Sequence, residues 1–130
     1  MSDTPFPQGL MLSDDLIFIS KVAGAAQSLG LSVQSARSAD ALVALAERQA
    51  PGGVLLDLNH PELDLPELLS RLRVACPVMP LVVGYGSHVE AATLHAARLA
   101  GCDRVLPRSR FVEELPRSLR GWLRGEGAGE

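Results

Sequence analysis

The sequence predicts a single α/β domain built on a parallel β-sheet that is covered by helices on both faces. The chain has 130 residues, the size of one ordinary domain. Five short apolar runs alternate with five segments of helical periodicity, as in parallel sheets with right-handed crossovers. Two of these runs, at residues 53–56 and 81–83, are apolar throughout and not alternating, which indicates strands buried on both faces.

The expected strands are short and recur along the whole chain. They cover residues 9–12, 31–35, 53–56, 81–83 and 104–106. Between the first two strands, apolar residues recur at i, i+3 and i+4 spacing up to Gly30, a residue typical of helix ends, and predict the first helix. Residues 38–50 repeat this pattern and predict the second helix.

The third and fourth helices are predicted from the residues at their N-terminal ends. Asp64 with Glu67 three positions later is typical of a helix start. Ser87 and Glu90 have the same spacing, which predicts a capped start at Ser87 and a helix that ends at Gly101.

The last helix is predicted from one apolar stripe and one proline. The stripe consists of Phe111, Leu115, Leu119 and Trp122. Pro116 breaks a helix unless it lies in the first turn, so we expect this helix to begin within residues 112–115 and to run to about residue 123.

Composition excludes several classes of protein. A chain with 47% hydrophobic and 21% charged residues is not disordered, and it contains no apolar run of the ~18 residues that span a bilayer. The N-terminus lacks the basic and apolar regions of a signal peptide, and the two cysteines have no metal-binding spacing. We therefore expect a cytoplasmic domain over residues 9–124, with an N-terminal arm at 1–8, a disordered tail at 125–130 and no membrane partner.

Acidic residues follow the first and third strands. In a parallel sheet the functional site lies beyond the carboxyl ends of the strands, where the chain reads Ser13-Asp14-Asp15 and later Asp57-Leu-Asn59. If these strands are neighbours about 5 Å apart, three carboxylates converge and repel each other, and a cation such as Mg²⁺ removes the conflict. Asp14 and Asp15 fit helix caps or exposed turns equally well, whereas Asp57 follows a buried strand and must be solvated or paired.

These motifs resemble the receiver domain of two-component response regulators. The resemblance rests on the acids after the first strand, on Asp57 after the apolar third strand, and on Asn59 and Pro61 beyond it, and it extends from about residue 9 to 123. It implies the CheY-like, flavodoxin-like fold: a doubly wound five-stranded sheet in the order 2-1-3-4-5 with five helices. It also implies Asp57 as the phosphate-accepting residue, and Asp14, Asp15, Asp57 and the backbone carbonyl of Asn59 as candidate Mg²⁺ ligands.

The sequence departs from the family after the fourth strand. The family has a Ser or Thr there that binds the phosphoryl group, whereas this position falls on Gly84, Tyr85 or Gly86. Ser87 is a possible substitute, although its spacing to Glu90 favours a helix cap.

Three further positions depart from the family. Ser13 stands at the first acidic position, Arg108 stands near the lysine that contacts the phosphoryl group, and Val105 stands at the aromatic switch position. Arginine is a planar fork and not a compact ammonium, so the exchange at Arg108 is not conservative. With these groups altered, phosphorylation has few differential contacts through which to shift a two-state equilibrium.

The resulting hypothesis is a degenerate receiver that acts by protein–protein interaction and is not an enzyme. One alternative is a working receiver that accepts phosphate on Asp57 with Mg²⁺. Another is a small-molecule or nucleotide-binding flavodoxin-like domain, which the Gly84-x-Gly86 pair between strand and helix suggests.

A basic region near the C-terminus is the candidate partner surface. Residues 98–124 contain seven arginines and three acidic residues, and the candidate face consists of Arg98, Arg104, Arg110 and Arg117. In receivers the surface of helix 4, strand 5 and helix 5 makes dimer and output contacts, so the resemblance implies a homodimer, a histidine kinase or a downstream effector as partner. A net charge of −3 and 4% aromatic residues argue against nucleic-acid binding.

Overall fold

A computed structural model describes residues 8–125, and the remainder of the expected arm and tail lies outside the described residues. Five parallel strands form one sheet in the order β2-β1-β3-β4-β5, which confirms the predicted fold class. The strands are β1 (Gly9–Leu12), β2 (Val33–Ala36), β3 (Gly53–Asp57), β4 (Leu81–Gly86) and β5 (Arg104–Pro107).

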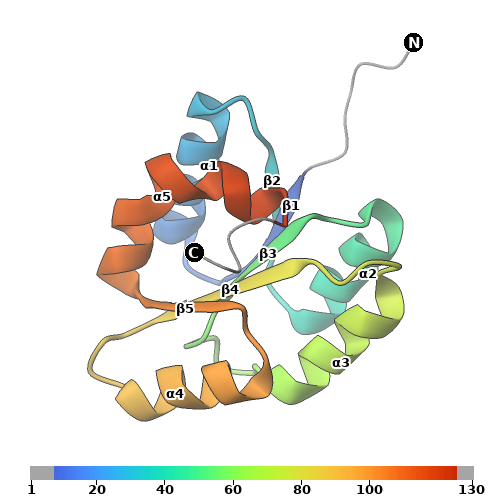
Figure 1. Cartoon of the computed structure of the whole chain (residues 1–130), viewed down its shortest axis with the longest axis vertical. Helices are drawn as coiled ribbons and strands as arrows, with labels where there is room; N and C mark the ends of the chain where they lie inside the picture. The colour runs from blue at the N-terminus through green and yellow to red at the C-terminus, as the bar shows by residue number, and fades with distance from the viewer. Residues whose placement is uncertain (1–7, 126–130) are drawn as a thin grey trace.

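Five helices cover the two faces of the sheet (Figure 1). They are α1 (Leu16–Ser28), α2 (Ala39–Gln49), α3 (Leu65–Ala75), α4 (Ala91–Ala100) and α5 (Arg108–Leu123). Helices α1 and α5 lie on one face, and α2, α3 and α4 lie on the other. Within residues 8–125, no helix is both long enough and apolar enough to cross a membrane.

Two cores lie on opposite faces of the sheet because successive strand residues point to opposite sides. On β3, Val54 and Leu56 belong to the core under α2, α3 and α4, whereas Leu55 belongs to the core under α1 and α5. All residues of β1, β3 and β4 are buried, so the continuous apolar runs did indicate strands covered on both faces.

The predicted starts of α2 and α3 are confirmed. Ser38 caps α2 by accepting a hydrogen bond from Ala41 N, and Asp64 caps α3 by accepting one from Glu67 N. The chain after α1 turns through Gly30 at a φ of 73°, in the left-handed region that glycine tolerates best.

The predicted start of α4 at Ser87 is wrong. The helix begins at Ala91 after Glu90, which makes no side-chain cap hydrogen bond. Strand β4 continues to Gly86, so Ser87 lies in the following turn, where its hydroxyl accepts from Val89 N at 3.3 Å. The Glu90 carboxylate instead accepts a hydrogen bond from Asn59 Nδ2, so a contact between two loops replaces the capping box.

The predicted start of α5 within residues 112–115 is also wrong, because the helix begins at Arg108 and keeps Pro116 in its interior. The proline lies on the exposed side and removes one intrahelical hydrogen bond. The earlier start buries Phe111 completely on the same stripe as Trp122, and burial of each such side chain is worth about 1.5–3 kcal/mol. This burial offsets the cost of the proline.

Candidate functional site

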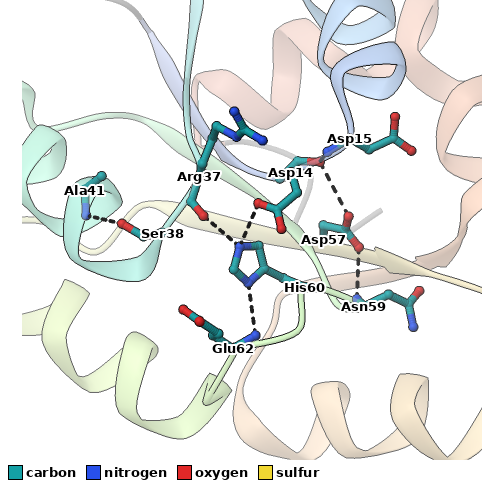
Figure 2. Close-up of polar contacts among 10 residues, drawn as sticks. Asp14, Asp15, Arg37, Ser38, Ala41, Asp57, Asn59, His60 and Glu62 are labelled. Carbon is teal, nitrogen blue, oxygen red and sulfur yellow. Dashed lines mark hydrogen bonds and ion pairs between the residues drawn. The ribbon is translucent and has the colours of Figure 1, made fainter.

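Asp57 lies at the carboxyl end of β3 and is the central acidic group of the site (Figure 2). Its side chain is buried, and one oxygen, Oδ1, accepts a hydrogen bond from Asn59 N at 2.9 Å. The other oxygen, Oδ2, is 3.5 Å from the Ser13 hydroxyl, which donates to it. Both oxygens of this carboxylate therefore have partners within the chain.

Ser13 follows β1 and is fully buried beside Asp57. Its hydroxyl oxygen also accepts a hydrogen bond from Asp15 N at 3.0 Å, so the side chain links the β1–α1 loop to the end of β3. The neutral hydroxyl of Ser13 adds no charge repulsion to the Asp57 carboxylate.

Asp15, a predicted metal ligand, has a different role in the structure. Its Oδ1 accepts hydrogen bonds from Ile17 N at 3.0 Å and from Phe18 N at 3.2 Å. The residue is therefore the N-cap of α1, which is the helix-cap alternative for this side chain. In Figure 2 its carboxylate points away from Asp57.

Asp14 contacts His60, which lies between β3 and α3 in the loop of residues 58–64 (the acceptor loop). His60 Nε2 is 3.2 Å from Asp14 Oδ1 and 2.8 Å from the Arg37 carbonyl oxygen. His60 Nδ1 accepts a hydrogen bond from Glu62 N at 3.3 Å. Nothing local in the sequence predicts the Arg37 contact, because it depends on where the β2–α2 loop lies.

The side chains of the predicted Mg²⁺ ligands Asp14, Asp15 and Asp57 already have partners within the chain in this arrangement. Asp15 caps a helix, and Asp14 faces the N–H group of His60. Across residues 8–125, no three His, Cys, Asp or Glu side chains are grouped so that they could hold a metal ion. Mg²⁺ requires near-octahedral oxygen geometry, and these side chains do not fit it as they stand.

Tyr85 occupies the position opposite Asp57 in the β3–β4 register. It is fully buried, and its ring stacks on Phe18 and Phe111 with centroid distances of 4.8 Å and 4.4 Å. Its hydroxyl lies near Ser13 but makes no hydrogen bond with any described residue. Among Gly84, Tyr85 and Gly86, which the sequence left open, Tyr85 is the residue opposite Asp57 in this register.

The phenol of Tyr85 stays protonated. Burial is the largest cause that raises its pKa above the ordinary value, and the negative charge of Asp57 raises it further. Ser13 and Arg108 lower the pKa of Tyr85, but each effect is smaller than that of burial. A neutral aromatic hydroxyl therefore lies at the position opposite the candidate acceptor.

Arg108 lies at the first residue of α5 and is directed toward the acceptor loop. Its Nη2 donates a hydrogen bond to Asn59 Oδ1 at 3.4 Å, and its guanidinium carbon is 5.6 Å from the centroid of the Phe18 ring. No ion pair between Arg108 and Asp57 occurs in the described part of the chain. The guanidinium is held by an amide and an aromatic face.

The side chain of Asn59 ties the acceptor loop to the β4–α4 loop. Its Oδ1 accepts from Ser87 N at 3.1 Å as well as from Arg108, and its Nδ2 donates to Glu90 Oε1 at 2.8 Å. The Ser87 hydroxyl accepts from Val89 N, so the structure assigns it a turn contact and not a contact with Asp57. Asn59 was predicted to act through its backbone carbonyl, and its side-chain contacts were missed.

The candidate basic face contains both paired and exposed arginines. Glu114 is buried in α5, where it accepts from Arg110 Nε at 2.8 Å and lies 3.7 Å from Arg104. Arg98 donates to the Val105 carbonyl oxygen at 3.5 Å. Arg117 is exposed and makes no side-chain hydrogen bond or ion pair with any residue in 8–125.

The Glu114 carboxylate has a lowered pKa. Burial, the largest single cause, acts to raise it, but the hydrogen bonds from Ser118 and Arg110 and the charges of Arg104 and Arg110 together outweigh burial. Two of the four predicted partner-face arginines therefore contribute to an internal ion-pair cluster.

Comparisons with known proteins agree with this topology. No family model matches the sequence. The transcriptional regulatory protein TcrX of Mycobacterium tuberculosis is 26% identical over 118 residues, which are 91% of this chain and 50% of TcrX. This chain thus spans about half the length of that relative.

Solved structures give the same result. The receiver domain of NtrX from Brucella abortus matches with a TM-score of 0.74 and 25% identity, over 88% of this chain and 97% of that one. The receiver domain of Ssk1 from Saccharomyces cerevisiae, solved with the histidine phosphotransfer protein Ypd1, matches with a TM-score of 0.67 and 16% identity, over 88% and 92%. The strand order and these likenesses together show that the chain has the CheY-like receiver fold of two-component response regulators.

Proposed function

We propose that this chain is a pseudo-receiver, a signalling domain that acts through protein–protein contacts and not through phosphorylation of Asp57. The observation that carries the proposal is Tyr85. It lies opposite Asp57 at the end of β4, where the receiver family has a small hydroxyl residue that moves toward the phosphoryl group.

Tyr85 is poorly suited to such a movement. Its ring packs against the Phe18 and Phe111 rings, which also contact each other at a centroid distance of 5.9 Å. Withdrawing the ring exposes apolar area worth about 1.5–3 kcal/mol and breaks two aromatic contacts worth about 0.5–1.5 kcal/mol each. A phosphoryl group has to supply this free energy before the residue can respond to it.

Arg108 and Val105 support the same conclusion. The Arg108 guanidinium is already engaged by Asn59 and by the Phe18 ring, so movement toward Asp57 breaks existing contacts. Val105, at the switch position of β5, is a buried aliphatic residue of the core and has no ring to rotate. Phosphorylation would therefore shift the equilibrium between two conformations of this domain only slightly.

The nucleotide-binding alternative is not favoured. Gly84 and Gly86 lie within β4, and a phosphate-binding loop requires glycines in the turn before a helix. A Cβ atom on Gly84 would lie 3.0 Å from the Leu58 side chain, so this glycine gives Leu58 room to pack. The working-receiver alternative keeps one supporting observation, which is the position of Asp57 at the carboxyl end of β3.

The proposed partner surface is formed by α4, β5 and α5. Arg117 is fully available on α5, whereas Arg98, Arg104 and Arg110 are partly engaged in contacts within the domain. This charge favours an acidic surface on a histidine kinase, a phosphotransfer protein, a downstream effector or a second copy of the chain. The Ssk1 receiver domain, which was solved with Ypd1, offers a precedent for binding a signalling partner.

Intact-mass measurement after incubation with Mg²⁺ and acetyl phosphate tests the proposal. We expect no phosphoryl adduct on the folded wild-type protein, and none on an Asp57→Asn control. A single adduct on the wild type that disappears in Asp57→Asn contradicts the proposal and makes the chain a working receiver. A Tyr85→Thr variant, tested in parallel, shows whether the aromatic residue is what prevents the reaction.

A further inference from the structure

His60 joins three loops at the carboxyl edge of the sheet. It comes from the acceptor loop, and its Nε2 lies 2.8 Å from the Arg37 carbonyl oxygen and 3.2 Å from Asp14 Oδ1 (Figure 2). Its Nδ1 accepts the Glu62 N–H at 3.3 Å. Because Nδ1 accepts, the ring proton is on Nε2, and this N–H group points toward both oxygens.

We infer that His60 takes the place of a divalent cation at Asp14, so that hydrogen bonds alone hold the loops around Asp57 together and this site does not bind Mg²⁺. The inference rests on the proposed function for the identity of the site. It goes further by assigning His60 as a positioning residue, a role that the receiver resemblance does not supply.

The first argument is that the Asp14 carboxylate already has a donor. The His60 side chain is 4% exposed, whereas the Asp14 side chain is 45% exposed. The His60 ring therefore lies in the protein interior, whereas the Asp14 carboxylate lies at the solvent-exposed edge of the site. A cation bound to Asp14 Oδ1 competes with a buried N–H group that otherwise retains only the Arg37 carbonyl as partner.

The second argument is that the other acidic groups do not compensate. Ser13 presents a hydroxyl where a second carboxylate would stand, and Asp57 is satisfied by this hydroxyl and by Asn59 N. The Asp15 carboxylate is used by α1. Mg²⁺ dehydrates reluctantly and is held by carboxylates, so one engaged and one satisfied carboxylate make a poor site.

The consequence is a fixed arrangement of the three loops that His60 contacts. His60 holds the acceptor loop, the β1–α1 loop and the β2–α2 loop together without a ligand. A partner protein that binds this edge of the sheet therefore contacts the same surface whether or not Mg²⁺ is present.

Paramagnetic Mn²⁺ titration of ¹⁵N-labelled protein tests the inference, and it measures cation binding independently of phosphoryl transfer. We expect no selective broadening of the loop amides in the wild type at millimolar Mn²⁺. His60→Gln places an amide nitrogen where Nε2 lies and should behave as the wild type. His60→Leu keeps the size of the side chain but removes the donor, and should bind Mn²⁺ at least about tenfold more tightly.

Asp14→Asn in the His60→Leu background is the matched control, because it should abolish the binding that was gained. Selective broadening of the loop amides of the wild type at millimolar Mn²⁺ overturns the inference. So does a folded His60→Leu protein that gains no affinity over the wild type.

A second measurement uses the wild type alone and decides the matter if His60→Leu does not fold. The ¹⁵N chemical shifts of the His60 ring report which nitrogen carries the proton and whether its hydrogen bonds persist. We expect a protonated Nε2 and an unprotonated Nδ1 that do not change when millimolar Mg²⁺ is added. A shift of these signals with Mg²⁺ means that Asp14 has left His60, and the inference fails.

Discussion

The two faces of the sheet are packed with different kinds of side chain. The core under α1 and α5 contains every aromatic residue in the described chain, namely Phe18, Tyr85, Phe111 and Trp122. The core under α2, α3 and α4 is aliphatic, and a solvent-open pocket of about 260 Å³ lies between α3 and α4. The aromatic face is a continuous stack with ring centroids 4.4–5.9 Å apart.

This difference bears directly on the site because Tyr85 belongs to the stack and also faces Asp57. A switching residue has to move, whereas a close-packed core residue is held by the neighbours around it. On the aliphatic face, Leu58 lies next to the pocket and has space to move. The expected rigidity is thus greatest on the side of the sheet that holds Tyr85.

The largest expected effect on stability is that of Phe111→Ala, which tests the packing of the aromatic face. Phe111 is fully buried at the centre of the stack, with Tyr85, Phe18 and Trp122 as its aromatic neighbours. Its truncation should lower the free energy of unfolding by about 3–5 kcal/mol, measured by urea denaturation. Val78→Ala, at an exposed position, is the control and should change it by less than about 0.5 kcal/mol. A loss below about 2 kcal/mol for Phe111→Ala means that the stack does not hold this face rigid.

Tyr85→Phe is expected to stabilise the protein. The Tyr85 hydroxyl is buried and has no hydrogen-bond partner among the described residues, and such a group costs about 1–3 kcal/mol. Removing it while keeping the ring should raise the free energy of unfolding by roughly 1 kcal/mol, measured by urea denaturation at constant pH. A decrease instead indicates that the hydroxyl is hydrogen bonded in solution, with Ser13 as its nearest candidate partner.

The sequence was sufficient for the fold because its signals were redundant. The alternation of apolar runs and helical segments, together with the glycines at helix ends, led to a five-stranded parallel sheet, and the receiver resemblance supplied the strand order. Asp57 was located for the same reason, since a charged residue directly after a buried strand has few alternative roles.

The errors arose where a distant contact overrode a local pattern. The pairing of Ser87 with Glu90 is a reasonable helix start, but Asn59, from another loop, binds both the Ser87 backbone and the Glu90 side chain. The length of β4 was underestimated because glycines usually end strands, and its pairing with β3 carries it to Gly86. The position of Tyr85 depends on this register, which a local pattern does not contain.

The smallest expected effect comes from the aliphatic face, in Gly84→Ala. A Cβ atom at Gly84 would lie 3.0 Å from Leu58 Cδ2, which is closer than ordinary packing. Leu58 also lines the pocket between α3 and α4, so its side chain can move away from the new methyl group. The cost should therefore be about 1 kcal/mol or less, at the low end for an overpacked core. A loss above about 3 kcal/mol in the urea-denaturation measurement means that Leu58 is as firmly held as Tyr85, and the contrast between the two faces is then wrong.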